Sequence, residues 1–272
     1  MKKNLTNILL ILVFFIGLSL LLYPSFSDYW NSLHQSQAIA SYSEAVAEIK
    51  TDDTNIMLEQ AHEFNRNLAA KDNPWAMTDE ERKVYNETLN ISNTGIMGYI
   101  EIPAIGCSLP IYHGTDEAVL QIAVGHIAET SLPVGGESTH TVLSGHRGLP
   151  SAKLFTDLDK VVVGDRFLLQ ILDETLTYEV DQILIVLPHE VDALAIEEGM
   201  DLCTLVTCTP YGINSHRLLV RGHRVENEAE EKTVRVTADA LQIEPTLVAV
   251  ALAVPGLLIL LVLLLFTTRR RK

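Results

Sequence analysis

The sequence contains little cysteine, few aromatic residues and a shortage of positive charge. Its 272 residues include three cysteines and 6% aromatic residues, and 20 lysines and arginines face 35 aspartates and glutamates. An acidic chain offers no basic face to phosphates, which argues against nucleic-acid binding. No glycine-rich phosphate loop and no C-x2-C or H-E-x-x-H spacing is present. We therefore expect no metal site and no cofactor.

Long apolar runs are present at both ends. The first, within residues 1–23, follows Lys2 and Lys3, and the second, within 246–268, precedes the basic tail 269–272. Roughly 20 apolar residues cross a bilayer, so we predict a transmembrane helix at the second run. The first run could be a signal peptide, but it lacks a small-x-small cleavage site, which favours an uncleaved helix. Basic residues that flank a membrane span stay on its cytoplasmic side. We therefore predict cytoplasmic termini and a central region on the extracellular face of the cell membrane.

The hydrophobic pattern divides this central region into three parts. Residues 24–95 begin with apolar residues at helical spacing, interrupted at Thr51–Asn55, and continue into a polar loop; we predict a helical extension of two helices. Residues 96–225 change to short β-rich runs separated by Gly, Pro and Asp, which predicts a mainly β barrel or sandwich. Residues 226–245 form an acidic linker. Six of the 20 basic residues lie at the two ends of the chain. The central region therefore holds 14 basic residues and all 35 acidic ones, which makes it strongly acidic.

The three cysteines have different sequence surroundings. Cys203 lies inside an apolar run and Cys208 at its end. Five residues apart on one strand, their side chains point to opposite faces and cannot form a disulfide. Cys107 lies in a turn-like segment and could reach one of them. We expect no disulfide, a buried Cys203, and an accessible thiol at Cys208, because side chains at strand ends lie at the rim of a sheet.

A histidine and an arginine complete a candidate site with Cys208. His146 follows a predicted strand in TVLSGHRG, and Arg217 begins the strand after Cys208. Together they supply a nucleophile, a proton shuttle and a positive charge for the oxyanion of acyl transfer. Taken singly, a buried cysteine or a salt-bridged arginine is the commoner interpretation. Rival residues for these roles are His140, His216, His223 and Arg221.

These motifs resemble those of the sortases, the Gram-positive cell-surface transpeptidases. TLVTC at Thr204–Cys208 is similar to the TLxTC signature of that family, and SGHRG and the downstream Arg217 match it as well. The similarity covers about residues 99–225 and includes GYIEIP and LPIYHGT. The helical N-terminus, the loop before the β region and the C-terminal apolar run resemble the class C branch, which polymerises pilins.

The resemblance implies both a fold and a reaction. The fold is an eight-stranded sortase-type β-barrel with an N-terminal helical extension and a lid loop, flanked by transmembrane helices. In the reaction, Cys208 attacks the Thr carbonyl of an LPxTG-like sorting signal and forms a thioester, while His146 acts as general acid and base and Arg217 stabilises the oxyanion. A lysine amine of another pilin then resolves the thioester. The implied partners are pilin proteins and the membrane.

The same resemblance predicts a lid over the site. In this branch the lid typically has the sequence Asp-Pro-aromatic, with the Asp near the catalytic Arg and the aromatic ring over the Cys. Here the triplet is Asn73-Pro74-Trp75, preceded by Asp72. An asparagine cannot form an ion pair, so either Asp72 takes that role or the lid is held more weakly. Trp75 is the predicted anchor.

Two other functions fit the same residues. One is a surface cysteine hydrolase of the same architecture, whose turnover would not depend on an added amine. The other is a non-enzymatic, membrane-tethered adhesion or pilus-assembly protein in which Cys208 is inert.

Overall fold

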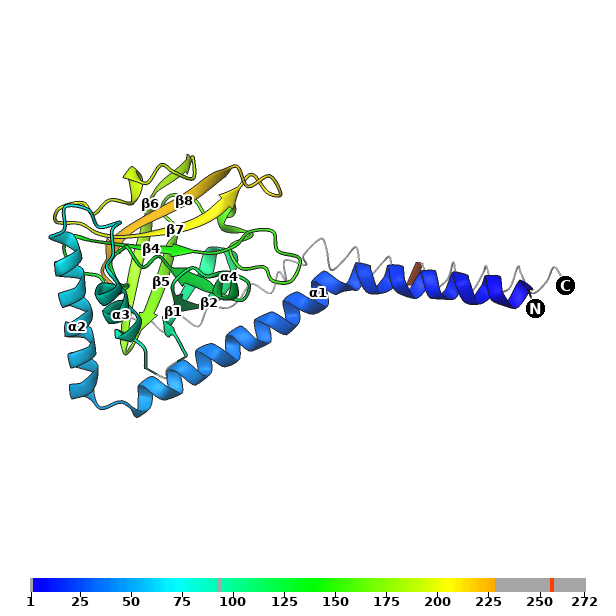
Figure 1. The fold of residues 1–272 in the computed structure, drawn as a ribbon, viewed down its shortest axis with the longest axis horizontal. Helices are drawn as coiled ribbons and strands as arrows, with labels where there is room; N and C mark the ends of the chain where they lie inside the picture. The colour runs from blue at the N-terminus through cyan, green and yellow to red at the C-terminus, as the bar shows by residue number, and fades with distance from the viewer. Residues whose placement is uncertain (1, 92–93, 228–254, 257–272) are drawn as a thin grey trace. The chain divides into compact units, whose positions relative to one another are not determined.

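The computed structural model describes residues 2–91, 94–227 and 255–256, and within them four helices and a closed barrel of eight strands (Figure 1). The helices are α1 (Lys2–Glu48), α2 (Thr51–Ala69), α3 (Asp79–Glu87) and α4 (Glu117–Leu120). The strands are β1 (Ile96–Ile102), β2 (Cys107–His113), β3 (Val124–His126), β4 (Thr139–Ser144), β5 (Arg166–Ile171), β6 (Glu174–Val186), β7 (Asp201–Thr209) and β8 (His216–Val225). Apart from 226–227 and 255–256, the predicted linker 226–245, second membrane span 246–268 and tail 269–272 lie outside the described residues.

The N-terminal part of α1 is long and apolar enough to cross a membrane. Its large side chains Leu12, Phe15 and Leu20 are all more than half exposed. Apolar surface of this kind is unfavourable in water and favourable in lipid. Pro24 lies inside the same helix, so α1 continues without a break past the predicted boundary between residues 1–23 and 24–95.

The second half of α1 packs on the barrel within the compact unit Asn31–Ala229. Tyr42 is buried, and its hydroxyl donates to the Met97 carbonyl at 3.0 Å and accepts from the Leu172 amide at 2.7 Å. Burial raises the pKa of Tyr42 to about 12, so the hydroxyl keeps the proton that it donates. Asn31 donates to the Ser151 carbonyl at 2.7 Å, close to the segment that carries the candidate histidine.

The break between α1 and α2 comes just before the predicted position. Lys50 has an extended backbone (φ −72°, ψ 144°) and precedes the first residue of α2. Thr51–Asn55 therefore forms the first turn of α2, and the prediction of a break there was wrong. Asp52 and Asp53 are suited to this turn because carboxylates stabilise the positive end of a helix dipole.

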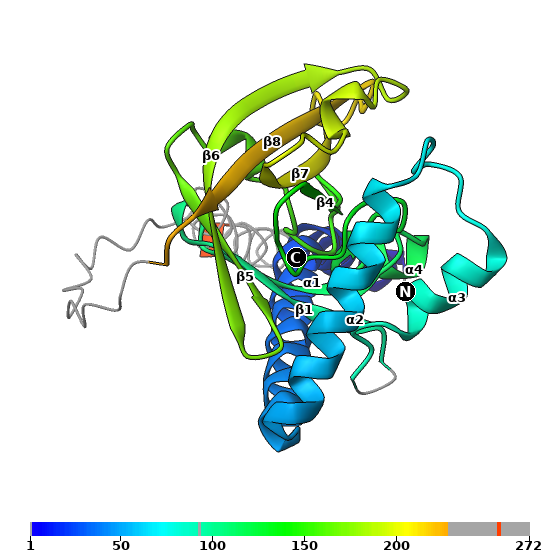
Figure 2. The ribbon, with the colours of Figure 1, turned by 90° about the vertical axis from the view of Figure 1, so that its left-hand side faces the viewer.

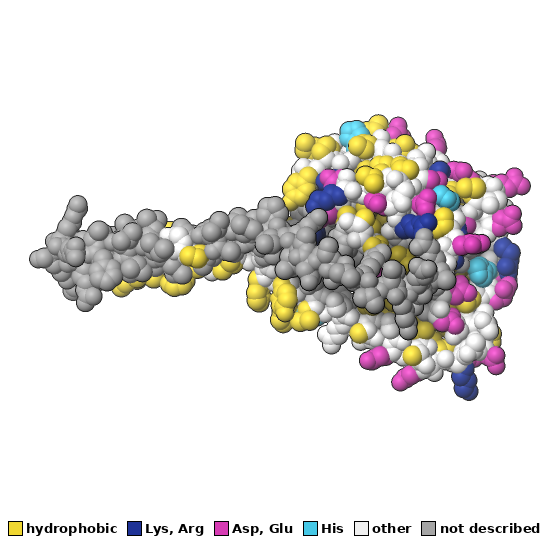
Figure 3. All heavy atoms as spheres, turned by 180° about the vertical axis from the view of Figure 1, so that it is seen from behind, with side chains coloured by type: hydrophobic (Ala, Val, Ile, Leu, Met, Phe, Trp, Pro, Cys, Tyr) yellow, Lys and Arg dark blue, Asp and Glu magenta, His cyan; other side chains and the backbone are white. Residues whose placement is uncertain are grey.

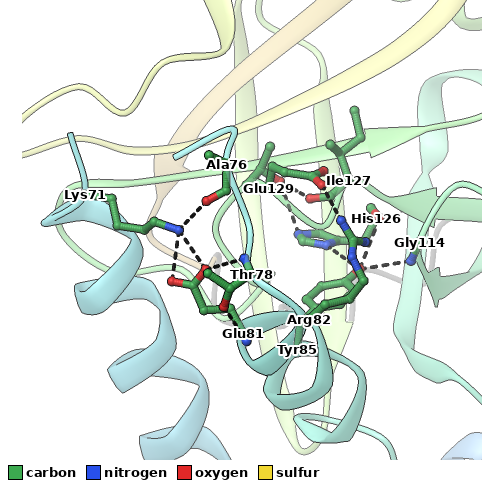
Figure 4. A network of polar contacts seen from close by, with 11 residues as sticks. Lys71, Ala76, Thr78, Glu81, Arg82, Tyr85, Gly114, His126, Ile127 and Glu129 are labelled. Carbon is green, nitrogen blue, oxygen red and sulfur yellow. Dashed lines mark hydrogen bonds and ion pairs between the residues drawn. The ribbon is translucent and has the colours of Figure 1, made fainter. Parts of the chain in front are cut away.

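The predicted polar loop after α2 contains a further helix, α3. Its start is a capping box: the Glu81 amide donates to the Thr78 hydroxyl at 3.2 Å, and the Thr78 amide donates to the Glu81 carboxylate at 2.8 Å. The T-x-x-E pattern is a known helix-start signal that the loop prediction did not use. Tyr85 anchors α3 through a buried hydroxyl that accepts from the Gly114 amide at 2.9 Å (Figure 4).

The strands close in the order β1-β2-β3-β4-β7-β8-β6-β5, with β5 returning to β1. The pairs β2–β3 and β4–β7 are parallel and the others antiparallel. Closure removes free strand edges, to which other chains could otherwise pair. The structure confirms short strands throughout residues 96–225; β3 is the shortest of them, with three residues. Figure 2, seen from the left of Figure 1, shows α2 in the foreground and α3 to its right.

Apolar side chains pack on both faces of the sheet around β7. Leu205 and Val220 are fully buried inside the barrel. Val142, Val206 and Leu219 face outward and form a second, smaller cluster with Leu194 from the β6–β7 connection. The outer face of β7 and β8 is therefore covered for most of its length, and Cys208 lies two residues beyond Val206 on that face.

Candidate active site

Cys208 and Arg217 are direct partners across the β7–β8 ladder. Side chains of directly opposite residues lie on the same face, with Cβ atoms about 5 Å apart. Both residues are partly exposed, at the end of the outer-face apolar cluster. The two strands thus put the side chains of Cys208 and Arg217 next to each other on one face of the sheet.

The Arg217 side chain has no carboxylate partner among the described residues. Its Nη1 donates to the carbonyl oxygens of His216 at 3.1 Å and Asn214 at 3.4 Å. Backbone carbonyls orient the guanidinium without neutralising its charge. The positive charge is therefore available to stabilise an anion that forms next to Cys208.

The parallel pairing of β4 with β7 brings His146 toward the same strand end. The Gly145 amide donates to the Val206 carbonyl at 3.0 Å, and the Thr207 hydroxyl donates to the Gly145 carbonyl at 2.8 Å. These bonds hold the residue before His146 against the stretch before Cys208. Thr207 was missed by sequence reasoning, because its partner is known only once the strands are paired.

The His146 ring is accessible and has an acidic neighbour. Its side chain is 28% exposed, and Nε2 lies 3.8 Å from a carboxylate oxygen of Glu117 in α4. Glu117 is itself largely exposed, so this contact contributes little energy in water. An accessible imidazole can exchange protons with a bound substrate, as a general acid and base must do.

The other two cysteines are unsuited to nucleophilic chemistry. Cys203 is fully buried in the barrel core, as predicted, and burial raises the pKa of its thiol well above the ordinary value. Burial also raises the pKa of Cys107, to about 12. A thiol acts as a nucleophile only as thiolate, so neither is reactive near neutral pH. All three cysteines are free.

Comparison with known proteins matches the barrel to one family. A model of the sortase domain matches residues 100–225. The solved structure of sortase C1 from Streptococcus agalactiae is 53% identical to this chain, covering 71% of this chain and 100% of that one, with a TM-score of 0.69. The chain belongs to the sortase family. The members of this family are cysteine transpeptidases, and the predicted eight-stranded sortase barrel is confirmed.

Other sortases align over similar ranges. Sortase C from Streptococcus pneumoniae is 42% identical, covering 71% of this chain and 98% of that one, with a TM-score of 0.63. Sortase D of Bacillus subtilis is 31% identical over 131 residues, which are 47% of this chain and 63% of that protein. This sortase therefore spans less than two thirds of the length of the curated relatives that it matches. Sortases C from several bacteria are among its neighbours in solved structures.

The rival residues in this sortase have structural partners. His140 is buried, with Nδ1 2.8 Å from the Ala195 carbonyl and Nε2 2.7 Å from the Thr204 hydroxyl, and burial lowers its pKa. Arg221 binds both oxygens of the Asp181 carboxylate at 3.0 Å and also Glu197 at 2.7 Å. Two further histidines contact close neighbours: His223 lies 3.9 Å from Asp181, and His216 lies 2.9 Å from the Ser215 hydroxyl.

The predicted lid residues lie away from the site in this structure. The connection between α2 and α3, which carries Asp72, Asn73, Pro74 and Trp75, is at the left of the barrel in Figure 1, whereas the β7–β8 turn is at its right. The Asn73 side chain accepts from the Trp75 amide at 3.2 Å and so closes a local turn. The Trp75 side chain remains 38% exposed. The structure does not bring these residues to Cys208 or Arg217.

A metal site needs a group of ligating side chains, and a polyanion site needs a cluster of basic charge on one face. Within the described residues, no group of three or more His, Cys, Asp or Glu side chains could hold a metal ion. Acidic side chains are spread over the described atoms of the face in Figure 3, where the basic ones form no continuous patch.

Proposed function

We propose that this chain is a membrane-anchored cysteine transpeptidase that cleaves an LPxTG-like sorting signal and joins it to a lysine of another pilin. The observation that carries the proposal is the direct pairing of Cys208 with Arg217. The hydrogen bonds of Gly145 to β7 support His146 as the third member. Pilin substrate specificity is ascribed to the similar sortase C of Streptococcus pneumoniae.

The first half-reaction forms a thioester. Cys208 gives its proton to His146, and Sγ attacks the Thr carbonyl of the sorting signal. Arg217 stabilises the negative charge that develops on the carbonyl oxygen. The C–N bond to Gly breaks, His146 protonates the departing amine, and the acyl group stays on Cys208.

The second half-reaction passes the acyl group to an amine. The lysine nitrogen of the next pilin attacks the thioester carbonyl, and His146 accepts the proton that the amine loses. The C–S bond breaks, and the proton returns to Sγ. The thioester keeps the acyl group activated, so isopeptide formation needs no external energy source.

The membrane has a direct part in this proposal. α1 would tether the barrel to the membrane, with the barrel on the extracellular face and both termini in the cytoplasm. Pilins that emerge through the same membrane then meet the site at a raised local concentration, since tethering turns encounter into a nearly intramolecular event.

The lid assignment of Asp72–Trp75 belongs to this proposal. It requires a second conformation in which the α2–α3 connection crosses to the β7–β8 end. Lys71 holds the present conformation through the Ala76 carbonyl at 2.6 Å and both oxygens of Glu81 at 2.9 Å (Figure 4). These contacts are partly exposed, so their loss costs little energy.

The test of the proposal is the amine dependence of the product. Full-length enzyme in detergent micelles is mixed with an LPxTG-type peptide and increasing amounts of a lysine-containing acceptor peptide. We expect an isopeptide product whose yield rises with acceptor concentration, retained in Cys107→Ala and lost in Cys208→Ala. Hydrolysed peptide whose yield is unchanged by the acceptor would contradict the proposal and identify a hydrolase.

A further inference from the structure

A largely buried arginine contacts the two segments that carry His146 and Cys208. Arg147 follows His146 directly, and its side chain is only 10% exposed. It lies in a segment of irregular structure between β4 and β5, where backbone pairing alone does not fix a side chain. The contacts of Arg147 therefore bear on where His146 lies.

The guanidinium contacts both the segment of His146 and that of Cys208. Nη2 forms an ion pair with Asp159, in a short turn later in the same connection. Nη1 lies 3.5 Å from the hydroxyl of Thr209, which follows Cys208 in the chain. The carbon of the guanidinium is 6.0 Å from the ring centre of Tyr211, within cation–π range.

Gly148, the residue after Arg147, leaves room for the ring of Tyr211. Gly148 has φ +77°, and a Cβ at this position would lie 2.8 Å from a ring carbon of Tyr211. A larger residue at 148 would push the ring away from the backbone. Tyr211 therefore packs on the segment that carries His146, although it belongs to the turn that follows Cys208.

Stability alone is a poor explanation for this arrangement. The buried Nε of Arg147 has no hydrogen-bond partner among the described residues. A buried cation with an unsatisfied donor is costly, and apolar replacements of buried ion pairs are often neutral or stabilising. Because Arg147 joins two reactive segments, the geometry that it sets is the better explanation.

We propose that Arg147 is a positioning residue that fixes His146 relative to Cys208, by bridging Asp159 to Thr209 and Tyr211. The proposal rests on the proposed roles of Cys208 and His146. Arg147 does not touch the reacting atoms; it acts through the two segments that it joins. Its planar guanidinium can form the ion pair and lie over the ring at the same time, which a lysine ammonium cannot do as well.

The kinetic consequence is a loss of kcat with little change in KM. A displacement of a catalytic group by about 1 Å costs roughly a hundredfold in rate. In full-length enzyme in detergent micelles, we expect Arg147→Met to lower kcat for transpeptidation roughly ten- to a hundredfold, and Arg147→Lys to restore only part of the loss. Tyr211→Phe, which keeps the ring, should stay close to wild type. The matched control is Arg221→Met, which removes another largely buried, ion-paired arginine, in β8, and should retain kcat.

A double-mutant cycle separates positioning from general destabilisation. The rate of Cys208 alkylation by iodoacetamide is measured across pH 5–9 in the wild type, Arg147→Met, His146→Ala and the double variant. If Arg147 acts through His146, its substitution changes the rate and its pH profile in the wild type but has less than a twofold effect once His146 is absent. Equal effects in both backgrounds, or a loss in Arg221→Met as large as in Arg147→Met, would overturn the proposal.

The same experiment distinguishes this inference from the proposed function. Alkylation needs neither sorting peptide nor acceptor, so the cycle can be read even if the wild type forms no isopeptide. Failure of peptide transfer with an intact coupling between Arg147 and His146 would refute the proposed substrate alone. Transfer activity without any coupling would refute the positioning role alone.

Discussion

Acidification below pH 6.5 should destabilise the barrel through His126. This residue ends β3 and is fully buried. Its Nε2 lies 2.8 Å from the Ser131 carbonyl, and its Nδ1 lies 3.0 Å from the Tyr85 hydroxyl (Figure 4). A neutral ring satisfies both contacts, with Nε2–H donating to Ser131 and Nδ1 accepting from Tyr85. Burial, which disfavours the charged form, lowers the pKa of His126 to about 4.

The size of the effect follows from the difference in pKa between the folded and unfolded states. The unfolded chain binds a proton at His126 with a pKa near the ordinary 6.5, and the folded chain with a pKa near 4. Above pH 6.5 neither state binds the proton, so the stability contribution is fully present; it is lost as the pH falls through the window from 6.5 to 4. Each pKa unit is worth 1.36 kcal/mol, so the loss between pH 7.5 and 5.0 is about 2 kcal/mol.

Urea denaturation of the compact unit, residues 31–227, measures this loss. The free energy of unfolding is compared at pH 7.5 and 5.0 for the wild type and for His126→Gln, which offers the same two contacts but does not titrate. We expect the wild type to lose about 2 kcal/mol more than the variant. His140, whose pKa is also lowered by burial, is common to both proteins and cancels.

An equal pH dependence in the two proteins would refute the reasoning. A second readout does not depend on the folding of the variant. The ring protons of His126 in the wild type, followed by NMR, should show a neutral imidazole down to about pH 5. Titration near the ordinary 6.5 would contradict the assigned environment even if His126→Gln does not fold.

Three further predictions concern the thiols, the strand end and the lid. The pKa of Cys107 is about 12, so at pH 8 only about one Cys107 thiol in ten thousand is ionised. Mass spectrometry should therefore detect alkylation of Cys208 by iodoacetamide long before alkylation of Cys107. Gly145→Ala should lower peptide transfer at least tenfold, because the added Cβ lies 2.6 Å from a ring carbon of Phe155; unchanged kinetics would contradict the tight packing beside His146. Trp75→Ala should speed acyl-enzyme formation if the lid closes, and an unchanged rate would leave the α2–α3 connection as a static element.

Local sequence pattern predicted the parts of the site that depend on strand ends. Cys208 ends one apolar run and Arg217 begins the next, and a short turn between two strands forces an antiparallel pairing. The alternation of side chains separates Cys208 from Cys203, and the observed register puts Arg217 on the face of Cys208. These inferences need only the period of a strand, and the structure agrees with them.

Local pattern was insufficient where distant segments decide the outcome. The position of Gly145 beside Val206 depends on the parallel pairing of β4 with β7, which no turn specifies. The three residues of β3 are too few to show a period. The place of the lid residues depends on how α2 packs, and α2 is held by Asn65, whose side chain bonds the Leu132 backbone at 2.7 and 3.0 Å. Such contacts join residues that are far apart in the chain, so they produce no recognisable pattern in the sequence around either residue.

The central claim, thioester chemistry at Cys208, is tested most directly by trapping the acyl-enzyme. Full-length protein in detergent micelles is incubated with an LPxTG-type peptide without acceptor, and its intact mass is measured after rapid acid quenching. The account predicts an adduct of the peptide truncated after Thr, present in the wild type and in Cys107→Ala and absent in Cys208→Ala. An adduct that persists in Cys208→Ala, or transfer to a lysine acceptor without any adduct on the enzyme, would contradict it.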